Sequence, residues 1–362
     1  MDAKRFEHGG NIYQAIRSLD KKELLDFSAN INPFGLSESV RQAILDNVEQ
    51  IVHYPDASAY ELRKRICEYY GIHDRMLMLG NGATELLYLM CHILKPQKVI
   101  IPVPSFLEYE RAALSDGAII DYFYLFEHDV FELDFTLLAE RVEENSLIFL
   151  GNPNNPTGKL LDIEKLTAFL EKTKDYNCSV LVDESFIDFV KDAEQCTCRK
   201  LCFEYKNLFI LHSLTKFFAI PGLRLGFGIF QPWLVEKMQM ATDCWNVNSL
   251  AQAAGVAALF DKEYIKASKK SIIDLRQQLI GLLINVGDIR IFPSVANFLL
   301  LDISAMGVTS AEFKQLMSDK GVLIRDCSNY PGLDTRYIRI AVRSSEENKK
   351  FVEILKEVKE AI

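Results

Sequence analysis

Four polar residues in the middle of the chain follow apolar runs and are of types that could do chemistry together. Asn155 comes after the run LIFL, Asp183 after SVLV, and Lys216 after LFIL. Arg224 lies eight residues beyond Lys216. Ligands of open α/β sheets bind in the crevice outside the carboxyl ends of the strands. We therefore expect these four side chains to converge on one site.

Lys216 is the candidate for covalent chemistry. It lies in LHSLTKFFAIPGLRLGFG, where apolar residues flank a group that is strongly hydrated when charged. Burial disfavours the charged form of a lysine and so favours attack on a carbonyl group, as in Schiff-base formation. The alternative interpretation is a solvated lysine that ends a strand.

The elements that must position these residues alternate between strand and helix. Strands are predicted from short apolar runs at 98–103, 119–126, 147–150, 179–182 and 208–211. Helices are predicted at 83–94 and 162–176. This alternation predicts an α/β fold with a mostly parallel sheet covered by helices on both faces.

The last hundred residues predict a smaller α+β domain. Helices are expected at 275–285, 311–320 and 345–361, and strand-like runs at 289–303 and 337–342. We divide the chain into an N-terminal segment that joins the small domain, a large domain, and the small C-terminal domain, at 1–45, 46–260 and 261–362.

Composition limits the classes of protein to be considered. The 362 residues are 49% hydrophobic and 25% charged, which is typical of a globular protein. Fifty acidic against 41 basic residues disfavour a nucleic-acid partner. No apolar run approaches the ~20 residues of a membrane helix, and the N-terminus lacks the apolar core of a signal peptide. We expect a cytoplasmic protein that does not bind membranes.

The eight cysteines are expected to be reduced thiols, because the chain is long and shows no export signal. The segment QCTCRKLC places Cys196, Cys198 and Cys202 close together. Three thiols without a paired CxxC or a nearby histidine do not match the four ligands of structural zinc. We predict no metal site and leave the role of this cluster open.

Three motifs in this order resemble the fold-type I pyridoxal-phosphate enzymes of the histidinol-phosphate aminotransferase-like branch. They are GNPNNPTG, VLVDESF and SLTKFFAIPGLRLGFG. The similarity extends from SANINPFG near the N-terminus to YIRIAVR near the C-terminus. The resemblance implies pyridoxal 5'-phosphate as cofactor and an aspartate-aminotransferase-like fold, with a large sheet domain and a smaller α+β domain.

The resemblance also implies the central roles. Lys216 is similar to the lysine that bonds the cofactor aldehyde, and Asp183 to the carboxylate that pairs with the pyridine nitrogen. Asn155 is similar to the amide beside the cofactor's 3-oxygen. A protonated ring nitrogen makes the ring an electron sink for a carbanion. Lys216 and Asp183 would thus be the catalytic residues.

Further cofactor-binding positions follow from the same resemblance. Ser213 and Arg224 match phosphate ligands, and an arginine fork suits a dianionic phosphate. The segment GNGATE precedes an apolar helix, whose N-terminal amides would add a phosphate site. The remaining positions are Gly82, Ala83, Thr84, the ring-stacking Phe106, and Tyr54, which would reach the cofactor of the neighbouring subunit. The last assignment implies a homodimer with a shared active site.

Three details resemble the threonine-phosphate decarboxylases of cobalamin biosynthesis more than the aminotransferases. HGGN is followed by DFSANINPFG, Phe186 stands where aminotransferases usually have a tyrosine, and RDCSNYPGLDTRYIRIAVR resembles the decarboxylase C-terminal signature. The implied substrate-binding residues are His8, Asn32, Asn155, Arg325 and Arg339. An inward arginine on an apolar strand, such as Arg339, is costly unless it meets an anion.

We therefore expect decarboxylation of an O-phospho amino acid, L-threonine O-3-phosphate, to 1-amino-2-propanol phosphate for the cobalamin nucleotide loop. Serine phosphate, giving ethanolamine phosphate, remains a competing substrate, since one methyl group is worth only ~1–3 kcal/mol of discrimination. A histidinol-phosphate-type aminotransferase is the alternative enzyme, and a non-catalytic metabolite-binding relative is the alternative class. The sequence does not tell which arginine meets the carboxylate and which the phosphate.

Overall fold

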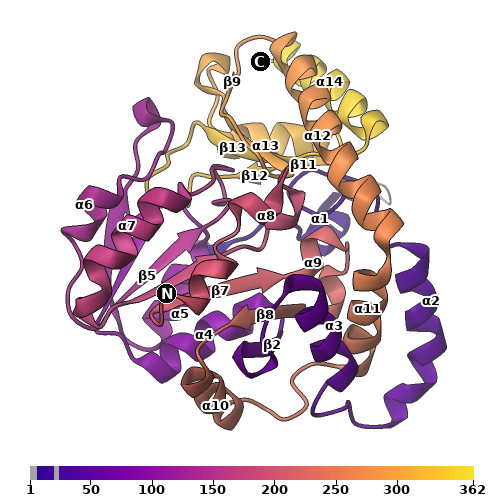
Figure 1. Ribbon diagram of the computed structural model, residues 1–362. Helices are drawn as coiled ribbons and strands as arrows, with labels where there is room; N and C mark the ends of the chain where they lie inside the picture. The colour runs from indigo at the N-terminus through magenta and orange to yellow at the C-terminus, as the bar shows by residue number, and fades with distance from the viewer. Residues whose placement is uncertain (1–5, 20–23) are drawn as a thin grey trace.

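The computed structural model describes residues 6–19 and 24–362 (Figure 1). Its largest element is a seven-stranded sheet in the order β2-β8-β7-β6-β5-β3-β4. Neighbouring strands are parallel except where β8 meets β2 and β7. The strands are β2 (Leu77–Asn81), β3 (Lys98–Val103), β4 (Ile119–Tyr124), β5 (Ser146–Gly151), β6 (Ser179–Asp183), β7 (Leu208–Ser213) and β8 (Leu225–Ile229).

Alternate residues of the central strands enter different hydrophobic clusters on the two faces of this sheet. In β6, Val180 and Val182 belong to one cluster and Leu181 to the other. The first face is covered by α3 (Tyr60–Tyr70), α6 (Phe135–Ala139), α7 (Ile163–Thr173) and α11 (Ser249–Phe260). The second face is covered by α4 (Ala83–Leu94), α5 (Leu107–Ser115) and α10 (Pro232–Ala241). Burial on both faces explains why these strands are continuous apolar runs, and it confirms the predicted α/β class.

Two strands of the large sheet were not expected from the sequence. Both β2 and β8 contain glycines, which are depleted in strands and weaken the pattern. A Cβ at Gly226 would lie 2.4 Å from the backbone nitrogen of Ala83. The glycine is therefore needed for the close approach of β8 to the start of α4, at the expense of strand propensity.

The smaller part of the molecule contains a four-stranded antiparallel sheet in the order β12-β13-β10-β9 and occupies the top of Figure 1. Its strands are β9 (Arg290–Ile291), β10 (Phe298–Asp302), β12 (Arg325–Asp326) and β13 (Tyr337–Ala341). Its helices are α12 (Lys262–Ile284), α13 (Ser310–Asp319) and α14 (Ser345–Glu360). This arrangement confirms the expected small α+β unit. The boundary at residue 260 remains a prediction, and α12 begins just after it.

The N-terminal segment pairs with the end of the chain. Strand β1 (Leu25–Asp26) runs parallel to β11 (Val322–Leu323) in a separate two-stranded sheet. Phe27 extends the contact, since the backbone nitrogen of Ala341 donates to its carbonyl oxygen at 2.8 Å. The other helices are α1 (Ile12–Leu19), α2 (Glu38–Asn47), α8 (Ala193–Cys196) and α9 (Leu214–Phe217).

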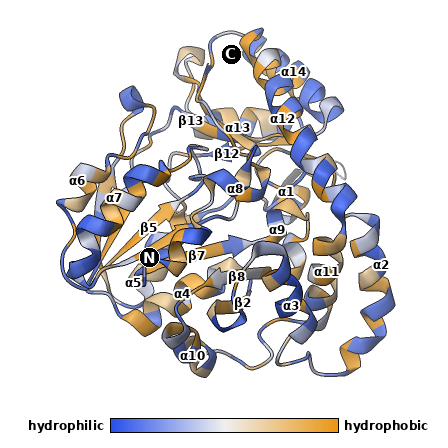
Figure 2. Cartoon of the chain, in the orientation of Figure 1, coloured by the Kyte–Doolittle hydropathy of each residue, from blue (hydrophilic) through white to orange (hydrophobic). Residues whose placement is uncertain are grey.

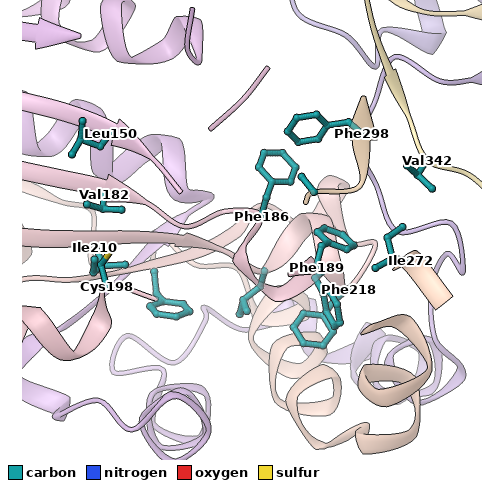
Figure 3. Packing of buried hydrophobic residues seen from close by; sticks show 14 of the residues in the cluster. Leu150, Val182, Phe186, Phe189, Cys198, Ile210, Phe218, Ile272, Phe298 and Val342 are labelled. Carbon is teal, nitrogen blue, oxygen red and sulfur yellow. The ribbon is translucent and has the colours of Figure 1, made fainter. Parts of the chain in front are cut away.

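One hydrophobic cluster connects the large and small sheets. Phe186, which follows β6, and Phe298 of β10 pack edge to face with ring centroids 5.0 Å apart, and Figure 3 shows the two rings next to each other. Phe218 and Ile272 belong to the same cluster. Figure 2 shows apolar central strands and outer helices with hydrophilic surfaces. Among the described residues, no helix is long and apolar enough to cross a membrane.

Candidate active site

Most of the predicted cofactor residues line a single cavity at the carboxyl ends of the large sheet's strands. This position is the one expected for a ligand site of an open α/β sheet. The cavity also receives residues that were not predicted, Tyr109, Ser185 and Thr215 among them. The predicted residues that line it are Ala83, Thr84, Phe106, Asn155, Asp183, Ser213, Lys216 and Arg224.

Lys216 is presented by α9, the short helix that directly follows β7. Its Nζ donates to Oγ1 of Thr215 at 3.2 Å. Burial, together with the neighbouring charges of Arg224 and Arg339, lowers the pKa of Lys216 to about 8 against the opposing effect of Asp183. A fraction of this lysine is therefore neutral near pH 7, which is the nucleophilic form.

Asp183 is held at the end of β6 by two donors. The backbone nitrogen of Ser185 donates to its Oδ1 at 2.9 Å, and the Tyr109 hydroxyl donates to its Oδ2 at 2.9 Å. Burial and the nearby carboxylate raise the pKa of Tyr109 well above its usual value, so this hydroxyl keeps its proton. Tyr109 was not predicted from the sequence. Its position three residues after Phe106, a spacing of about one helical turn, is the signal that could have identified it.

An anion-binding end of the cavity is built where α4 begins. Gly82 caps this helix without a side-chain hydrogen bond, so the first amides of α4 are available to a ligand. The Arg224 guanidinium lies beside Gly82, where a Cβ would come within 2.3 Å of Nη2. Within the described residues Arg224 forms no ion pair, and Nη1 donates to the carbonyl oxygen of Pro221 at 3.4 Å. A phosphate group matches this combination of an arginine fork and a helix N-terminus.

Arg325 and Arg339 occupy the neighbouring strands β12 and β13 of the small sheet. The Arg339 guanidinium donates to Oδ1 of Asn155 at 2.5 Å and to the carbonyl oxygen of Ser28 at 2.9 Å. Arg325 donates to Oδ1 of Asn329 at 2.6 Å. Both arginines are buried, and Asn155 joins this cationic pair to the cavity.

The predicted residues of the N-terminal half have different placements. His8 lies beside the cavity, with its ring 5.7 Å from that of Phe106. Asn32 is buried, and its side-chain amide donates to the Phe217 carbonyl oxygen and to Ser268 Oγ, both at 2.8 Å. The structure therefore shows Asn32 bracing the helix that carries the lysine, and does not bring its amide into the cavity.

Tyr54 lies outside the cavity of its own chain. Its side chain is 76% exposed and stacks on Trp245 with ring centroids 4.2 Å apart. An exposed aromatic pair of this kind is available to a second molecule. The assignment of Tyr54 to a neighbouring subunit therefore stays a prediction.

The cysteine cluster lies apart from this site. Cys198 and Cys202 are buried, and burial raises the pKa of both thiols well above the usual range, so they are not activated nucleophiles. Within residues 6–19 and 24–362, no group of three or more histidine, cysteine, aspartate or glutamate side chains is placed to hold a metal ion.

The donor set of the cavity fits pyridoxal phosphate. It offers a carboxylate at one end, an uncapped helix N-terminus with an unpaired arginine at the other, and a partly neutral lysine between them. Phe106 supplies a flat apolar face. Asp183 would hold the pyridine nitrogen, Arg224 and the amides of α4 the phosphate, and Lys216 the aldehyde carbon.

Comparisons with known proteins agree with this chemistry. The family model "Aminotransferase class I and II" matches residues 22–355. The threonine-phosphate decarboxylase of Salmonella typhimurium (strain LT2) is 34% identical over 354 residues, which cover 97% of this chain and 96% of the relative. The chain is therefore similar to a decarboxylase over almost its full length.

Solved structures give the same result for the fold. The histidinol-phosphate aminotransferase from Clostridium acetobutylicum has a TM-score of 0.87 at 32% identity, covering 94% of this chain and 100% of that chain. The L-threonine-O-3-phosphate decarboxylase from Porphyromonas gingivalis has a TM-score of 0.82 at 26% identity, covering 93% and 100% respectively. The expected resemblance and the expected fold type are confirmed.

Proposed function

The chain belongs to the aminotransferase class I and II family, and we propose that within this family it decarboxylates L-threonine O-3-phosphate to 1-amino-2-propanol phosphate. It is a pyridoxal-phosphate-dependent enzyme, as are the decarboxylases and aminotransferases that it resembles. The observation that carries the choice of substrate is the buried pair of Arg325 and Arg339, which suits a substrate with two anionic groups. The product would serve the nucleotide loop of cobalamin, the pathway of the decarboxylases that the sequence resembles.

When bound, the cofactor supplies a sink for the electron pair left by the departing carboxyl group. Asp183 holds a negative charge at the end of the cavity and, with Tyr109 donating to it, keeps that charge in a fixed position. Lys216 exchanges a proton near neutral pH because its pKa is about 8. After CO2 leaves, Lys216 delivers a proton to the substrate's Cα.

The arginine pair orients the substrate. A phosphorylated amino acid has a carboxylate and a phosphate, and each bidentate arginine contact is a strong, charge-assisted hydrogen bond. Holding both ends limits rotation of the substrate about Cα, so that the carboxyl group is presented for cleavage. Arg339 also donates to Asn155, which links the orientation of the substrate to the cofactor cavity.

Phe186 supports decarboxylation over amino transfer. Its ring lines the cavity and packs against Phe298. Because phenylalanine has no hydroxyl group, it cannot donate a hydrogen bond to the cofactor's 3-oxygen. Asn155 would then be the principal partner of that oxygen. A histidinol-phosphate aminotransferase remains the second candidate, since a structure of that activity is 32% identical to this chain.

The functional unit is proposed to be a homodimer with a shared active site. Tyr54 and Trp245 form an exposed stacked pair, and Ile51 and Val52 close to it are 62% and 76% exposed. Apolar side chains gathered in this way favour contact with another molecule. A second copy of the chain would cover them and receive Tyr54 at its cofactor phosphate.

We also propose a cytoplasmic location. All eight cysteines are free, and most of them are buried as separate thiols. Reduced thiols in a chain of this length are typical of a reducing compartment.

The test of the proposed function is a direct assay of the products. The purified holoenzyme is incubated with threonine phosphate, serine phosphate or histidinol phosphate, each with and without 2-oxoglutarate, and both CO2 and amine are measured. We expect CO2 from threonine phosphate without any need for 2-oxoglutarate. Keto acid formation that depends on 2-oxoglutarate, without CO2, would assign the chain to the aminotransferases instead.

A further inference from the structure

Glu108 is a buried carboxylate that the chemistry described above does not use. It lies in the first turn of α5, two residues after Phe106, and its side chain is 9% exposed. His8 Nε2 pairs with its Oε1 at 2.7 Å, and the Tyr88 hydroxyl donates to its Oε2 at 2.9 Å. Arg111 adds a longer contact at 3.3 Å.

The charge of Glu108 is stabilised by these donors. Burial alone raises the pKa of this carboxyl, but the hydrogen bonds from His8 and Tyr88 and the charge of Arg111 bring the pKa below its usual value. The pKa of Tyr88 is raised to about 12, so Tyr88 remains a donor throughout the physiological range. A buried negative charge thus faces His8 from the large domain.

The segment of residues 7–10 is also fastened on its other side. The Glu7 carboxylate pairs with Lys314 of α13 at 3.0 Å, and the Glu7 carbonyl oxygen accepts from Asn329 at 3.2 Å. Asn329 is the residue that accepts from Arg325. The segment therefore bridges α5, which presents Phe106 to the cofactor cavity, and the strand that carries Arg325.

The same segment lies tightly against Ser28. The backbone nitrogen of Gly10 donates to Ser28 Oγ at 2.8 Å, and a Cβ at Gly9 would come within 2.2 Å of the Ser28 carbonyl oxygen. That carbonyl oxygen accepts from Arg339. Residues 7–10 are thus connected to both arginines, to Arg325 through Asn329 and to Arg339 through Ser28.

A second cavity lies between this segment and α13. His8, Lys314 and Arg325 line it, so three basic side chains surround a space next to the proposed substrate position. Glu7 neutralises Lys314 within the same lining. The Arg325 guanidinium, which donates to the Asn329 amide oxygen, is the cation left among the described residues of this lining, and it suits a phosphate group.

We propose that Glu108 is a positioning residue, which anchors His8 through a charged hydrogen bond and so holds residues 7–10 against the phosphate end of the substrate. The proposal rests on the proposed function, because it takes a phosphorylated amino acid as the substrate. Glu108 does not touch the substrate. It acts through the imidazole, which can donate from Nδ1 to a phosphate while Nε2 donates to the carboxylate.

The experiment compares three variants with the wild-type holoenzyme on threonine phosphate. Glu108→Gln retains the shape of the side chain and removes its charge, His8→Asn removes the imidazole, and the third variant combines both. Because a hydrogen bond to a charged group is lost, we expect KM to rise about ten- to a hundred-fold in Glu108→Gln, with kcat within about two-fold of wild type. The combined variant should be no worse than His8→Asn, since Glu108 acts through His8.

Asp116→Asn is the matched control. Asp116 is a partly buried carboxylate at the other end of α5, where it pairs with His92 at 3.0 Å, and it lines neither cavity. This variant should leave KM unchanged. Visible absorbance of the bound cofactor checks that every variant is folded and loaded.

Two results would overturn the proposal. One is a KM of Glu108→Gln equal to that of wild type, and the other is a combined variant whose loss is the product of the two single losses. Failure of the proposed function is distinct, because the wild type would then release no CO2 from either phosphorylated amino acid. In that case calorimetric titration of inorganic phosphate into wild type and Glu108→Gln decides, and equal affinities reject the role of Glu108.

Discussion

Arg325 and Arg339 stand directly opposite each other on neighbouring antiparallel strands, and the Nε of each is buried without a hydrogen-bond partner. Side chains opposed in this way share one face of the sheet, and like charges in such a pair destabilise it. A bound anion between them would remove the repulsion and satisfy the remaining donors. The opposed charges therefore favour the binding of an anionic substrate at this position.

Removal of either arginine should impair the phosphorylated substrate strongly. Loss of one partner of a buried charged pair costs ~2–5 kcal/mol, so Arg325→Ala and Arg339→Ala should each lower kcat/KM at least about thirty-fold. The unphosphorylated amino acid should lose less in whichever variant removes the phosphate contact. Steady-state CO2 release with both substrates measures this, and equal losses for the two substrates in both variants would contradict it.

Lys216→Ala should lower the turnover rate at least about a thousand-fold. The reason is that no other amine in the part of the chain that the structure describes lines the cavity to act as nucleophile and proton carrier in place of Lys216. Lys216→Arg should be equally inactive, since a guanidinium stays charged and does not attack an aldehyde. Borohydride reduction followed by mass measurement should fix cofactor to the wild type and to neither variant. Lys206→Ala, an exposed lysine before β7, serves as the control and should retain full activity.

The stability of the cofactor-free protein should report the burial of Lys216. Its pKa is about 8 when folded and ordinarily near 10.5, so between these values the unfolded chain binds more protons. The contribution of this group to the free energy of unfolding therefore rises as the pH goes from about 8 to about 10.5, and it is lowest below pH 8. Cofactor-free Lys216→Met should be more stable than wild type at pH 7 by ~3 kcal/mol, since each unit of pKa shift corresponds to about 1.4 kcal/mol.

Denaturant titrations of these two proteins at several pH values measure the effect. The stability difference should shrink as the pH is raised from 8 to 10, because the folded wild-type lysine is already neutral there and the cost of removing its proton on folding falls with rising pH. Groups other than Lys216 titrate equally in both proteins and cancel. A difference that does not change with pH would show that the ammonium is well solvated in the folded state.

Substitutions of Asp183 and Tyr109 should lower the reaction rate to different extents. Asp183→Asn should fold and bind the cofactor but lose about a thousand-fold or more in rate, because an amide cannot hold the pyridine nitrogen protonated. Tyr109→Phe removes one hydrogen bond to that carboxylate and should cost about ten-fold. Rates with saturating cofactor measure both. An Asp183→Asn enzyme with more than about a tenth of the wild-type rate would exclude the assigned role.

A shared site predicts complementation between inactive subunits. In a dimer of one Lys216→Ala and one Tyr54→Ala subunit, one site has both lesions and the other has neither. Mixing the two inactive proteins should therefore restore part of the activity, provided that subunit exchange is verified by mass or fluorescence. No recovery after verified exchange would place Tyr54 outside the neighbouring site.

The elements that could be predicted from the sequence are those with a clear local pattern of apolar residues. Strand β3 and helix α4 consist mainly of apolar residues, and both were predicted with their observed bounds. Strands β2 and β8 were missed because their glycines serve contacts with α4 that no local pattern reveals. Helix α12 begins at Lys262, well before the predicted 275, since its first turns are largely polar.

Site residues that lie in a recognisable motif could be predicted from the sequence. Those that depend on a partner far away in the chain could not. Lys216 and Asp183 follow strands in recognisable segments, and both line the cavity. Tyr109 and Glu108 depend on partners far away in the chain, Asp183 and His8 respectively. For Asn32 the sequence could not indicate that the amide is already engaged with the Phe217 carbonyl oxygen and Ser268.

The pairing of β1 with β11 has a consequence for synthesis of the chain. Leu25 emerges from the ribosome early, whereas its partner Val322 is made almost three hundred residues later. The N-terminal segment must therefore wait unpaired while the large sheet forms, and closing so long a loop is costly in entropy. A chain interrupted before β11 would leave this segment without its partner strand. The neighbouring region of His8 and Asn32 would then also lack its support. The nascent enzyme thus has no finished substrate site until translation is nearly complete.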